Sequence, residues 1–171
     1  MTRGSGAAAP APEVSVLVPI YNVERYLERC LTSLVGQTYD DFEAICINDG
    51  STDGSRAIIQ RFLDADSRFR VIDKENSGYG ASMNRGLDAA RGRYVAILES
   101  DDFFEPDALA VLHEAAEMNQ AEVVKANFYL YWSRPEERRE LFRVVDEVEA
   151  GHVLRPLDDL AVFFRKPSIW S

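Results

Sequence analysis

The regular alternation of apolar runs with amphipathic stretches limits the fold of this chain more than any other feature. Short apolar runs, each predicted to be a buried strand, occur at 14–20, 42–48, 69–72 and 93–98. Between them, apolar residues fall at helical spacing from Asn22 to Gly36, after Gly54, at 81–90 and at about 105–118. This order predicts an α/β fold, with a mostly parallel central sheet and helices on both faces.

Local signals place the ends of several helices. Asn22 is predicted to cap the first helix, Gly36 to end it, and Pro106 to occupy the first position of the fourth. Three further segments follow, in which we expect an extended apolar stretch at 122–132, an exposed charged loop at 133–140 and helical potential at 152–164.

Composition narrows the class of protein. A chain of 171 residues with 46% hydrophobic content is large enough for one domain with a core. The net charge of −10 argues against nucleic acid or an anionic membrane as a partner of this segment. No apolar run approaches the roughly 20 residues of a membrane span. Membrane attachment of a full-length protein stays open.

Two sequence features indicate the compartment. Residues 1–13 are rich in Ala and Pro and lack an apolar h-region, so we expect a disordered tail and not a signal peptide. Cys30 and Cys46 lie in apolar stretches and are predicted to be buried free thiols. Free thiols are typical of a reducing compartment, which predicts a cytoplasmic protein.

Three polar clusters follow predicted strands at the point where each strand ends. They are Pro19–Asn22 after the first strand, Asn48–Ser51 after the second and Glu99–Asp102 after the fourth. The carboxyl ends of parallel strands meet at one edge of a sheet, where ligands of such folds bind. We therefore expect the three clusters to converge.

The third cluster holds three carboxylates in four residues, Glu99, Asp101 and Asp102. Crowded carboxylates repel one another unless a cation or protons neutralise them. Hard oxygen ligands suit Mg²⁺ or Mn²⁺, which also bind phosphate oxygens. A solvated acidic turn that caps the next helix is the other interpretation, but the position at a strand end, together with Asp49, favours a metal site.

Asp49, Tyr21 and the loop at 76–80 each allow two interpretations. Asp49 is either a turn residue or an acceptor for the N–H groups of a nucleobase, and Tyr21 either packs or stacks on a base. In the loop, Gly78 allows backbone to approach a phosphate, although the glycine spacing is not that of a dinucleotide-binding motif. The positions of the two histidines make a zinc site or a Ser-His-Asp triad improbable.

Four motifs in order carry a family resemblance. They lie at Val14–Asn22, Ile47–Asp53, Asn84–Tyr94 and Leu98–Asp107. Over about residues 14–130 the chain resembles family 2 glycosyltransferases with the GT-A fold. The resemblance implies a nucleotide-sugar-binding domain at 14–132 and the incomplete start of an acceptor-side region at 133–171.

The resemblance also implies roles for residues that match the motifs. Asp49 would hydrogen-bond the base of the nucleotide, usually uridine diphosphate, and Asp101 would hold Mn²⁺ or Mg²⁺, with Asp102 as a second metal ligand. The family usually has aspartate where this chain has Glu99, and many members have aspartate in place of Asn48. The candidate residues for the donor nucleotide are Pro19, Tyr21, Asn22, Asp49, Gly78, Glu99 and Asp101.

The implied reaction is inverting transfer from a nucleotide-sugar, with a UDP-sugar expected, to a hydroxyl of a saccharide or lipid-linked acceptor. Such transfer builds surface polysaccharide or glycolipid. A carboxylate base serves this reaction, and we expect it beyond Ser171, since Asp158 and Asp159 do not match its motif. The segment 166–171 resembles family sequence that precedes the base, which predicts that the chain stops before the enzyme is complete.

Two other functions remain open from the sequence. In the first, the chain alone binds a nucleotide-sugar and metal without transferring the sugar. A nucleotidyltransferase would share the fold and the metal acids. It would, however, need a loop rich in Gly and Lys or Arg directly after the first strand, and Pro19–Asn22 is not such a loop.

Overall fold

The computed structural model describes residues 10–133 and 136–143. The chain divides into two compact units, Met1–Leu109 and Ala110–Ser171. The nucleotide-sugar-binding domain at 14–132 stays a prediction. All three polar clusters belong to the first unit.

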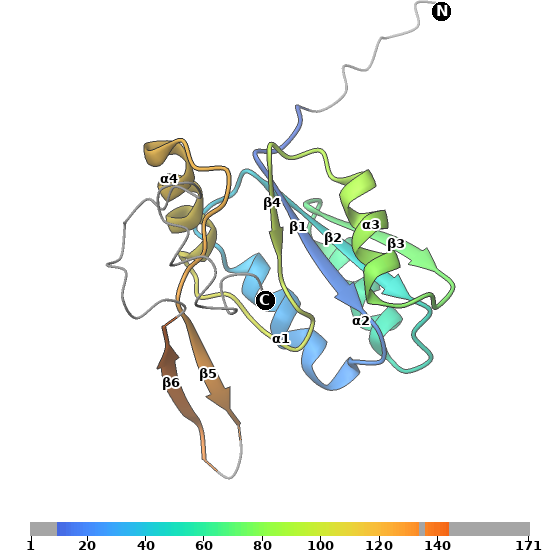
Figure 1. Ribbon diagram of the computed structural model, residues 1–171. Coiled ribbons are helices and arrows are strands. Elements are labelled where there is room, and N and C mark those ends of the chain that lie inside the picture. Colours follow the sequence, from blue (N-terminus) through green and yellow to red (C-terminus); the bar gives the residue numbers. More distant parts are fainter. Residues whose placement is uncertain (1–9, 134–135, 144–171) are drawn as a thin grey trace, which may run out of the picture. The chain divides into compact units, whose positions relative to one another are not determined.

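The first unit is built on a parallel sheet. Its strands lie in the order β3-β2-β1-β4, and every neighbouring pair is parallel (Figure 1). In chain order the elements are β1 (Val14–Ile20), α1 (Glu24–Val35), β2 (Phe42–Asp49), α2 (Ser55–Ala65), β3 (Phe69–Lys74), α3 (Tyr79–Ala89) and β4 (Tyr94–Ile97). The α/β fold that the sequence predicted is thus confirmed.

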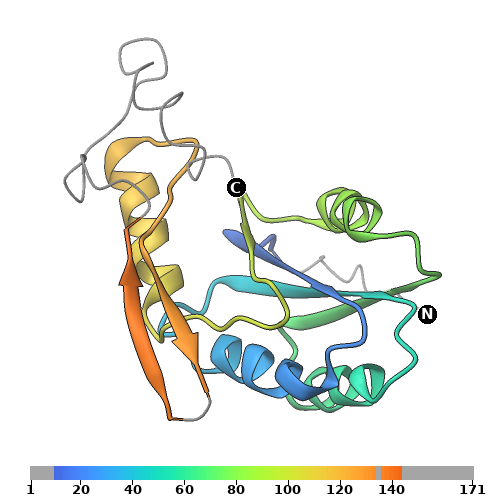
Figure 2. The ribbon, with the colours of Figure 1, turned by 60° about the horizontal axis from the view of Figure 1, so that its bottom comes forward.

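Helices cover both faces of this sheet. Helices α1 and α2 lie on one face and α3 lies on the other (Figure 2). Alternate residues of β1 serve the two faces, since Val16 and Val18 join the cluster of α1 residues while Leu17 packs with Met83 of α3. All seven residues of β1 are buried. Burial on both faces explains why its sequence is a continuous apolar run.

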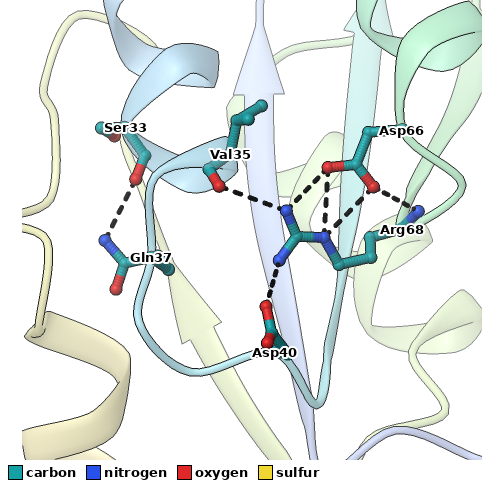
Figure 3. A network of polar contacts seen from close by, with 6 residues as sticks. All are labelled: Ser33, Val35, Gln37, Asp40, Asp66 and Arg68. Carbon is teal, nitrogen blue, oxygen red and sulfur yellow. Dashed lines mark hydrogen bonds and ion pairs between the residues drawn. The ribbon is translucent and has the colours of Figure 1, made fainter.

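Arg68 connects the loop after α1 with the loop after α2 (Figure 3). Its guanidinium donates to Asp66 at 2.7 Å, to Asp40 at 3.2 Å and to the carbonyl oxygen of Val35 at 3.2 Å. The hydrogen bonds from Arg68 hold the pKa of Asp66 below its usual value. This network fixes the amino ends of β2 and β3, opposite the three polar clusters.

Gln37 is a buried polar residue that anchors the end of the first unit. Its Nε2 donates to the carbonyl oxygens of Ser33 at 3.0 Å and Glu105 at 2.8 Å, and the first of these bonds is drawn in Figure 3. Its Oε1 accepts from the backbone N–H of Leu109 at 2.9 Å. The chain that follows the acidic cluster is therefore held against the end of α1.

The start of α1 differs from the prediction. The cap residue is Val23 and not Asn22, which has a positive φ of 50°. The carboxamide oxygen of Asn22 instead accepts from Thr52 N at 2.8 Å, and the first amide of α1 donates to Asp53 Oδ2 at 3.0 Å. The predicted capping was wrong because a carboxylate from another loop, that of Asp53, binds the first amide of the helix. Gly36 ends α1 as predicted.

The second unit contains a β-hairpin. Its strands β5 (Phe128–Trp132) and β6 (Arg138–Phe142) pair antiparallel. The predicted exposed loop at 133–140 was therefore wrong in its second half, since cross-strand pairing with an apolar neighbour makes the charged segment a strand. Of the extended stretch expected at 122–132, only 128–132 is a strand.

Helix α4 (Ala108–Asn119) begins two residues after the predicted start. Pro106 is not its first residue, because residues 106–107 form a turn. Residues 1–9 of the tail expected at 1–13, and the helical potential at 152–164, lie outside the described residues. Residues 10–13 form no helix or strand, and the carbonyl oxygen of Glu13 accepts from Tyr94 N at 2.9 Å. In the described part of the chain, no helix has both the length and the hydropathy to cross a bilayer.

Cys30 and Cys46 are buried and unpaired, as predicted. Burial raises the pKa of the Cys46 thiol to about 12 and raises that of Cys30 further. Both thiols are therefore protonated at neutral pH and act as small apolar side chains in the core.

Candidate functional site

The three polar clusters meet at one edge of the sheet. Strands β2, β1 and β4 are neighbours in that order, with Ile20 paired to Asn48 and Leu17 paired to Ile97. We call the edge where these strands end, after Ile20, Asp49 and Ile97, the carboxyl edge. The convergence predicted from the sequence follows from this strand order.

The cluster after β1 is bound to the loop that follows β2. Asn22 N donates to Ser51 Oγ at 3.1 Å, and Thr52 N donates to the Asn22 carboxamide. Pro19 lies within the buried strand, whereas the residue Tyr21 is 50% exposed. Tyr21 is thus the member of this cluster that offers an aromatic surface to a ligand.

Asp49 is buried, and the chain itself binds its carboxylate. Oδ1 accepts from Ser77 N at 2.9 Å and from the ammonium of Lys74, while Oδ2 accepts from Gly78 N at 2.9 Å. Burial alone would raise the pKa of Asp49, but the hydrogen bonds from Lys74, Ser77 and Gly78 together lower it. A carboxylate has about four acceptor positions. Described residues fill three of them, which leaves one.

Lys74 is a residue of this edge that the sequence did not indicate. The strand was predicted to end at residue 72, but β3 runs to Lys74, which lies directly beside Asp49 in the parallel pairing. The apolar pattern that predicts this strand ends at Ile72, so the sequence did not place Lys74 in it. A charged residue at the end of a strand becomes meaningful only when the register places it against an acid.

Gly78 directs the chain from β3 into α3. Its φ is 88°, a conformation in which glycine has no steric penalty, and its N–H donates to Asp49. Among the described residues, and leaving aside Gly78 and its two chain neighbours, no atom lies within 4 Å of the position that a Cβ would take. The backbone at Gly78 is therefore open on the side where a side chain would otherwise project.

The acidic cluster begins with a tight turn. Asp102 N donates to the carbonyl oxygen of Glu99 at 3.0 Å, and the same oxygen accepts from Cys30 Sγ at 3.6 Å. The carboxylate of Glu99 accepts from the hydroxyl of Tyr79 at 2.7 Å. This hydrogen bond raises the pKa of Tyr79 to about 12.

Asp101 and Asp102 are exposed at the same turn. Partial desolvation, followed by the charges of Asp101 and Glu99, raises the pKa of Asp102. Among the described residues, no group of three or more His, Cys, Asp or Glu side chains is arranged to hold a metal ion. Mg²⁺ and related ions are commonly held by one or two carboxylates with phosphate oxygens and water, and two adjacent exposed aspartates fit that donor set.

The segment after the acids is anchored on α1. Phe104 N donates to Ser33 Oγ at 3.1 Å, and the guanidinium of Arg29 lies 3.7 Å from the ring centroid of Phe103. Together with the contacts of Gln37 to Glu105 and Leu109, these bonds hold the backbone that follows the exposed aspartates. The carboxylates of Asp101 and Asp102 are thus presented from a fixed turn.

Comparison with known proteins identifies the family. The sequence matches the model of the family "Glycosyl transferase family 2" over residues 15–164. The chain belongs to glycosyltransferase family 2. It is 39% identical to the glycosyltransferase EpsJ of Bacillus subtilis (strain 168) over 143 residues, which cover 84% of this chain and 40% of EpsJ. It is 41% identical to the chondroitin synthase of Escherichia coli over 98 residues, or 57% of this chain and 14% of that protein.

Solved structures show the same fold. The TarS fragment 1–349 of S. aureus, in complex with UDP-GlcNAc, matches with a TM-score of 0.60 and 29% identity over 63% of this chain and 32% of that fragment. The mannosyltransferase PcManGT of Pyrobaculum calidifontis, in complex with GDP-Man and Mn²⁺, matches with a TM-score of 0.57 and 25% identity. The match covers 67% of this chain and 34% of that chain. The GT-A fold of the first unit is thereby confirmed. The chain spans less than half the length of each of these proteins.

Proposed function

We propose that this family 2 chain binds a UDP-sugar and a divalent cation at the carboxyl edge, as the donor-binding part of an inverting enzyme that builds polysaccharide. One observation carries the proposal, namely that the clusters after β2, β1 and β4 meet at a single edge of the parallel sheet. Ligands of open parallel sheets bind at this edge. The cytoplasm is its proposed compartment, in keeping with two unpaired cysteines.

The relatives support the class of substrate. TarS is described with UDP-GlcNAc and PcManGT with GDP-Man and Mn²⁺, so both are described with nucleoside diphosphate sugars. The name of the chondroitin synthase points to a growing saccharide as acceptor. Uridine is the proposed base because the family that the motifs resemble usually binds uridine diphosphate.

Residues of the carboxyl edge then have distinct tasks. Tyr21 offers its exposed ring to the base, and Asp49 offers its remaining acceptor position to a base N–H. Asp101 and Asp102 would hold the cation together with the diphosphate. When bound, such a cation supplies positive charge that neutralises the leaving diphosphate.

A second candidate is donor binding without transfer by this chain alone. The chain spans 40% of EpsJ, and none of the described residues is assigned as the base that accepts the proton of the acceptor hydroxyl. In this case the chain and the full-length protein would bind the donor alike but differ in transfer. Comparing sugar transfer by both, with a saccharide acceptor, separates the two functions.

Calorimetric titration with UDP, with and without Mn²⁺, tests the proposed site. We expect UDP to bind more tightly in the presence of Mn²⁺, and GDP to bind more weakly than UDP. Equal affinity for UDP with and without Mn²⁺ would refute the metal site. Equal affinity for UDP and GDP would refute the choice of base.

Asp101→Ala tests the metal ligand directly. Asp101 is exposed and packs in no core, so the fold should keep its thermal midpoint while the Mn²⁺ dependence of UDP binding is lost. Asp107→Ala is a matched control, because Asp107 is an exposed acid of the same segment but is not part of the acidic cluster. If both variants keep the Mn²⁺ dependence, Asp101 does not hold the metal.

A further inference from the structure

Tyr79 and Glu99 join two parts of the carboxyl edge that are 20 residues apart in the chain. The Tyr79 hydroxyl, at the first residue of α3, donates to Glu99 Oε1 at 2.7 Å. Hydrogen bonds from a hydroxyl to an ionised carboxylate are short and roughly twice as strong as neutral ones. The residue Tyr79 is 54% exposed, so this contact lies at the surface of the carboxyl edge.

The position of Tyr79 is set by the loop that precedes it. Asp49 accepts from the backbone N–H groups of Ser77 and Gly78, and Gly78 then turns the chain with its positive φ directly before Tyr79. Contacts therefore run from the end of β2, through this loop, to the end of β4. The hydroxyl of Tyr79 is the last contact of this series, and it determines where the Glu99 carboxylate lies.

The hydrogen bond separates Glu99 from the other two acids of its cluster. Glu99 is partly buried and bound to Tyr79, whereas Asp101 and Asp102 are exposed. In the described part of the chain the three carboxylates do not form a set that could hold one ion. Glu99 is only two residues from Asp101. If its long side chain were released from Tyr79, it could therefore reach an ion held by the two aspartates.

We propose that Tyr79 is a positioning residue that holds Glu99 out of the coordination shell of the cation, so that Asp101 and Asp102 are the only carboxylate ligands of this cluster. The proposal rests on the proposed function of the edge. If Tyr79 has this role, the protein should bind the cation only weakly in the absence of nucleotide. Because each added carboxylate increases the affinity of an oxygen site, a weak two-carboxylate site leaves the ion dependent on the diphosphate for its remaining ligands.

Binding of Mn²⁺ alone to the full-length protein tests this role, measured by calorimetry for wild type and for Tyr79→Phe. The phenylalanine variant keeps the ring and removes the hydroxyl, which releases Glu99. We expect it to bind Mn²⁺ about tenfold more tightly than wild type, as one carboxylate is added to the site. In the double variant Tyr79→Phe with Glu99→Gln, the affinity should return to the wild-type value.

Tyr94→Phe is the matched control. It removes the same hydroxyl from a tyrosine at the amino end of β4, opposite the carboxyl edge, and should leave Mn²⁺ affinity unchanged. Unchanged or weaker Mn²⁺ binding by a folded Tyr79→Phe variant would overturn the proposal. So would a gain that persists in the double variant, because Glu99 would then not be the added ligand.

Failure of the proposed function gives a different result. In that case wild-type protein shows no Mn²⁺-dependent binding of UDP, whatever happens at Tyr79. If wild type does bind UDP in a Mn²⁺-dependent manner but Tyr79→Phe leaves Mn²⁺ binding unchanged, the donor site stands and only the role of Tyr79 is refuted. Thermal midpoints of all variants, measured first, identify any variant that fails to fold.

Discussion

Replacement of Asp49 by asparagine should destabilise the first unit far more than its small size suggests. The new carboxamide keeps one oxygen acceptor but turns an N–H₂ group toward one of the three donors now bound to Asp49, which are Lys74, Ser77 N and Gly78 N. The side chains of Asp49 and Lys74 are only 6% and 13% exposed. Removing one partner of a buried ion pair costs about 3–5 kcal/mol, and we expect a loss in this range.

Asp73→Asn is the control for this prediction. Asp73 lies on the neighbouring strand β3 and pairs with Arg56 at 2.9 Å, but these side chains are 47% and 37% exposed. Exposed ion pairs contribute about 0–1 kcal/mol. Urea unfolding, followed by circular dichroism, should give midpoints that differ between the variants by roughly 1–2.5 M at an m-value of about 2 kcal/mol/M. Equal midpoints would refute the argument from burial.

The pH dependence provides a second test of Asp49. Its pKa is lowered in the folded state, so its stabilising contribution is fully present above the ordinary aspartate pKa of about 3.9 and is lost as pH falls through the lowered value. The difference in unfolding free energy between wild type and Asp49→Asn should be constant from pH 7 to 5. It should shrink only below about pH 4. A difference that shrinks already between pH 7 and 6 would mean that another group is responsible.

Two further substitutions test the anchors of the site. Gln37→Ala removes three hydrogen bonds of a buried carboxamide and should lower the unfolding free energy by about 2–4 kcal/mol in the same urea assay. Its control is Gln60→Ala, at an exposed position, which should change the unfolding free energy by less than about 1 kcal/mol. Gly78→Ala should lower the unfolding free energy by about 1–2 kcal/mol, because the φ of Gly78 is 88°, and should weaken UDP binding. Gly80→Ala, inside α3, should instead raise the unfolding free energy by about 0.5–1 kcal/mol. The same sign for both glycine variants would contradict the role of backbone conformation.

The fold was predictable because strands buried on both faces have a distinctive sequence. Val14–Ile20 and Phe42–Asp49 are mostly apolar and fully buried, and both strands agree with prediction to within one residue. The fourth strand was less well defined, because β4 alternates partly buried and exposed residues, with Val95 and Ile97 exposed. The second unit was predicted least well, since β6 consists of exposed residues that only cross-strand pairing makes a strand.

The site was predictable in its location but not in its contacts. The position of polar residues after the strands located the carboxyl edge, and parallel pairing brought the clusters together as expected. Asp49 binds groups 25, 28 and 29 residues away, and Tyr79 binds Glu99 across 20 residues. Such partners depend on strand register and loop geometry, which hydrophobic periodicity does not specify. For the same reason the cap of α1 was misassigned, as its carboxylate comes from another loop.

These contacts divide the acids of the carboxyl edge into two groups. Asp49, Asp53 and Glu99 each accept hydrogen bonds from the chain itself, so their charge is largely used to hold loops in place. Asp101 and Asp102 are exposed, and the pKa of Asp102 is raised by partial desolvation and by the neighbouring charges. A cation near these two aspartates would relieve that repulsion. Three acids therefore hold loops of the edge in place, and Asp101 and Asp102 are the two on which the proposed joint binding of a cation and a diphosphate rests.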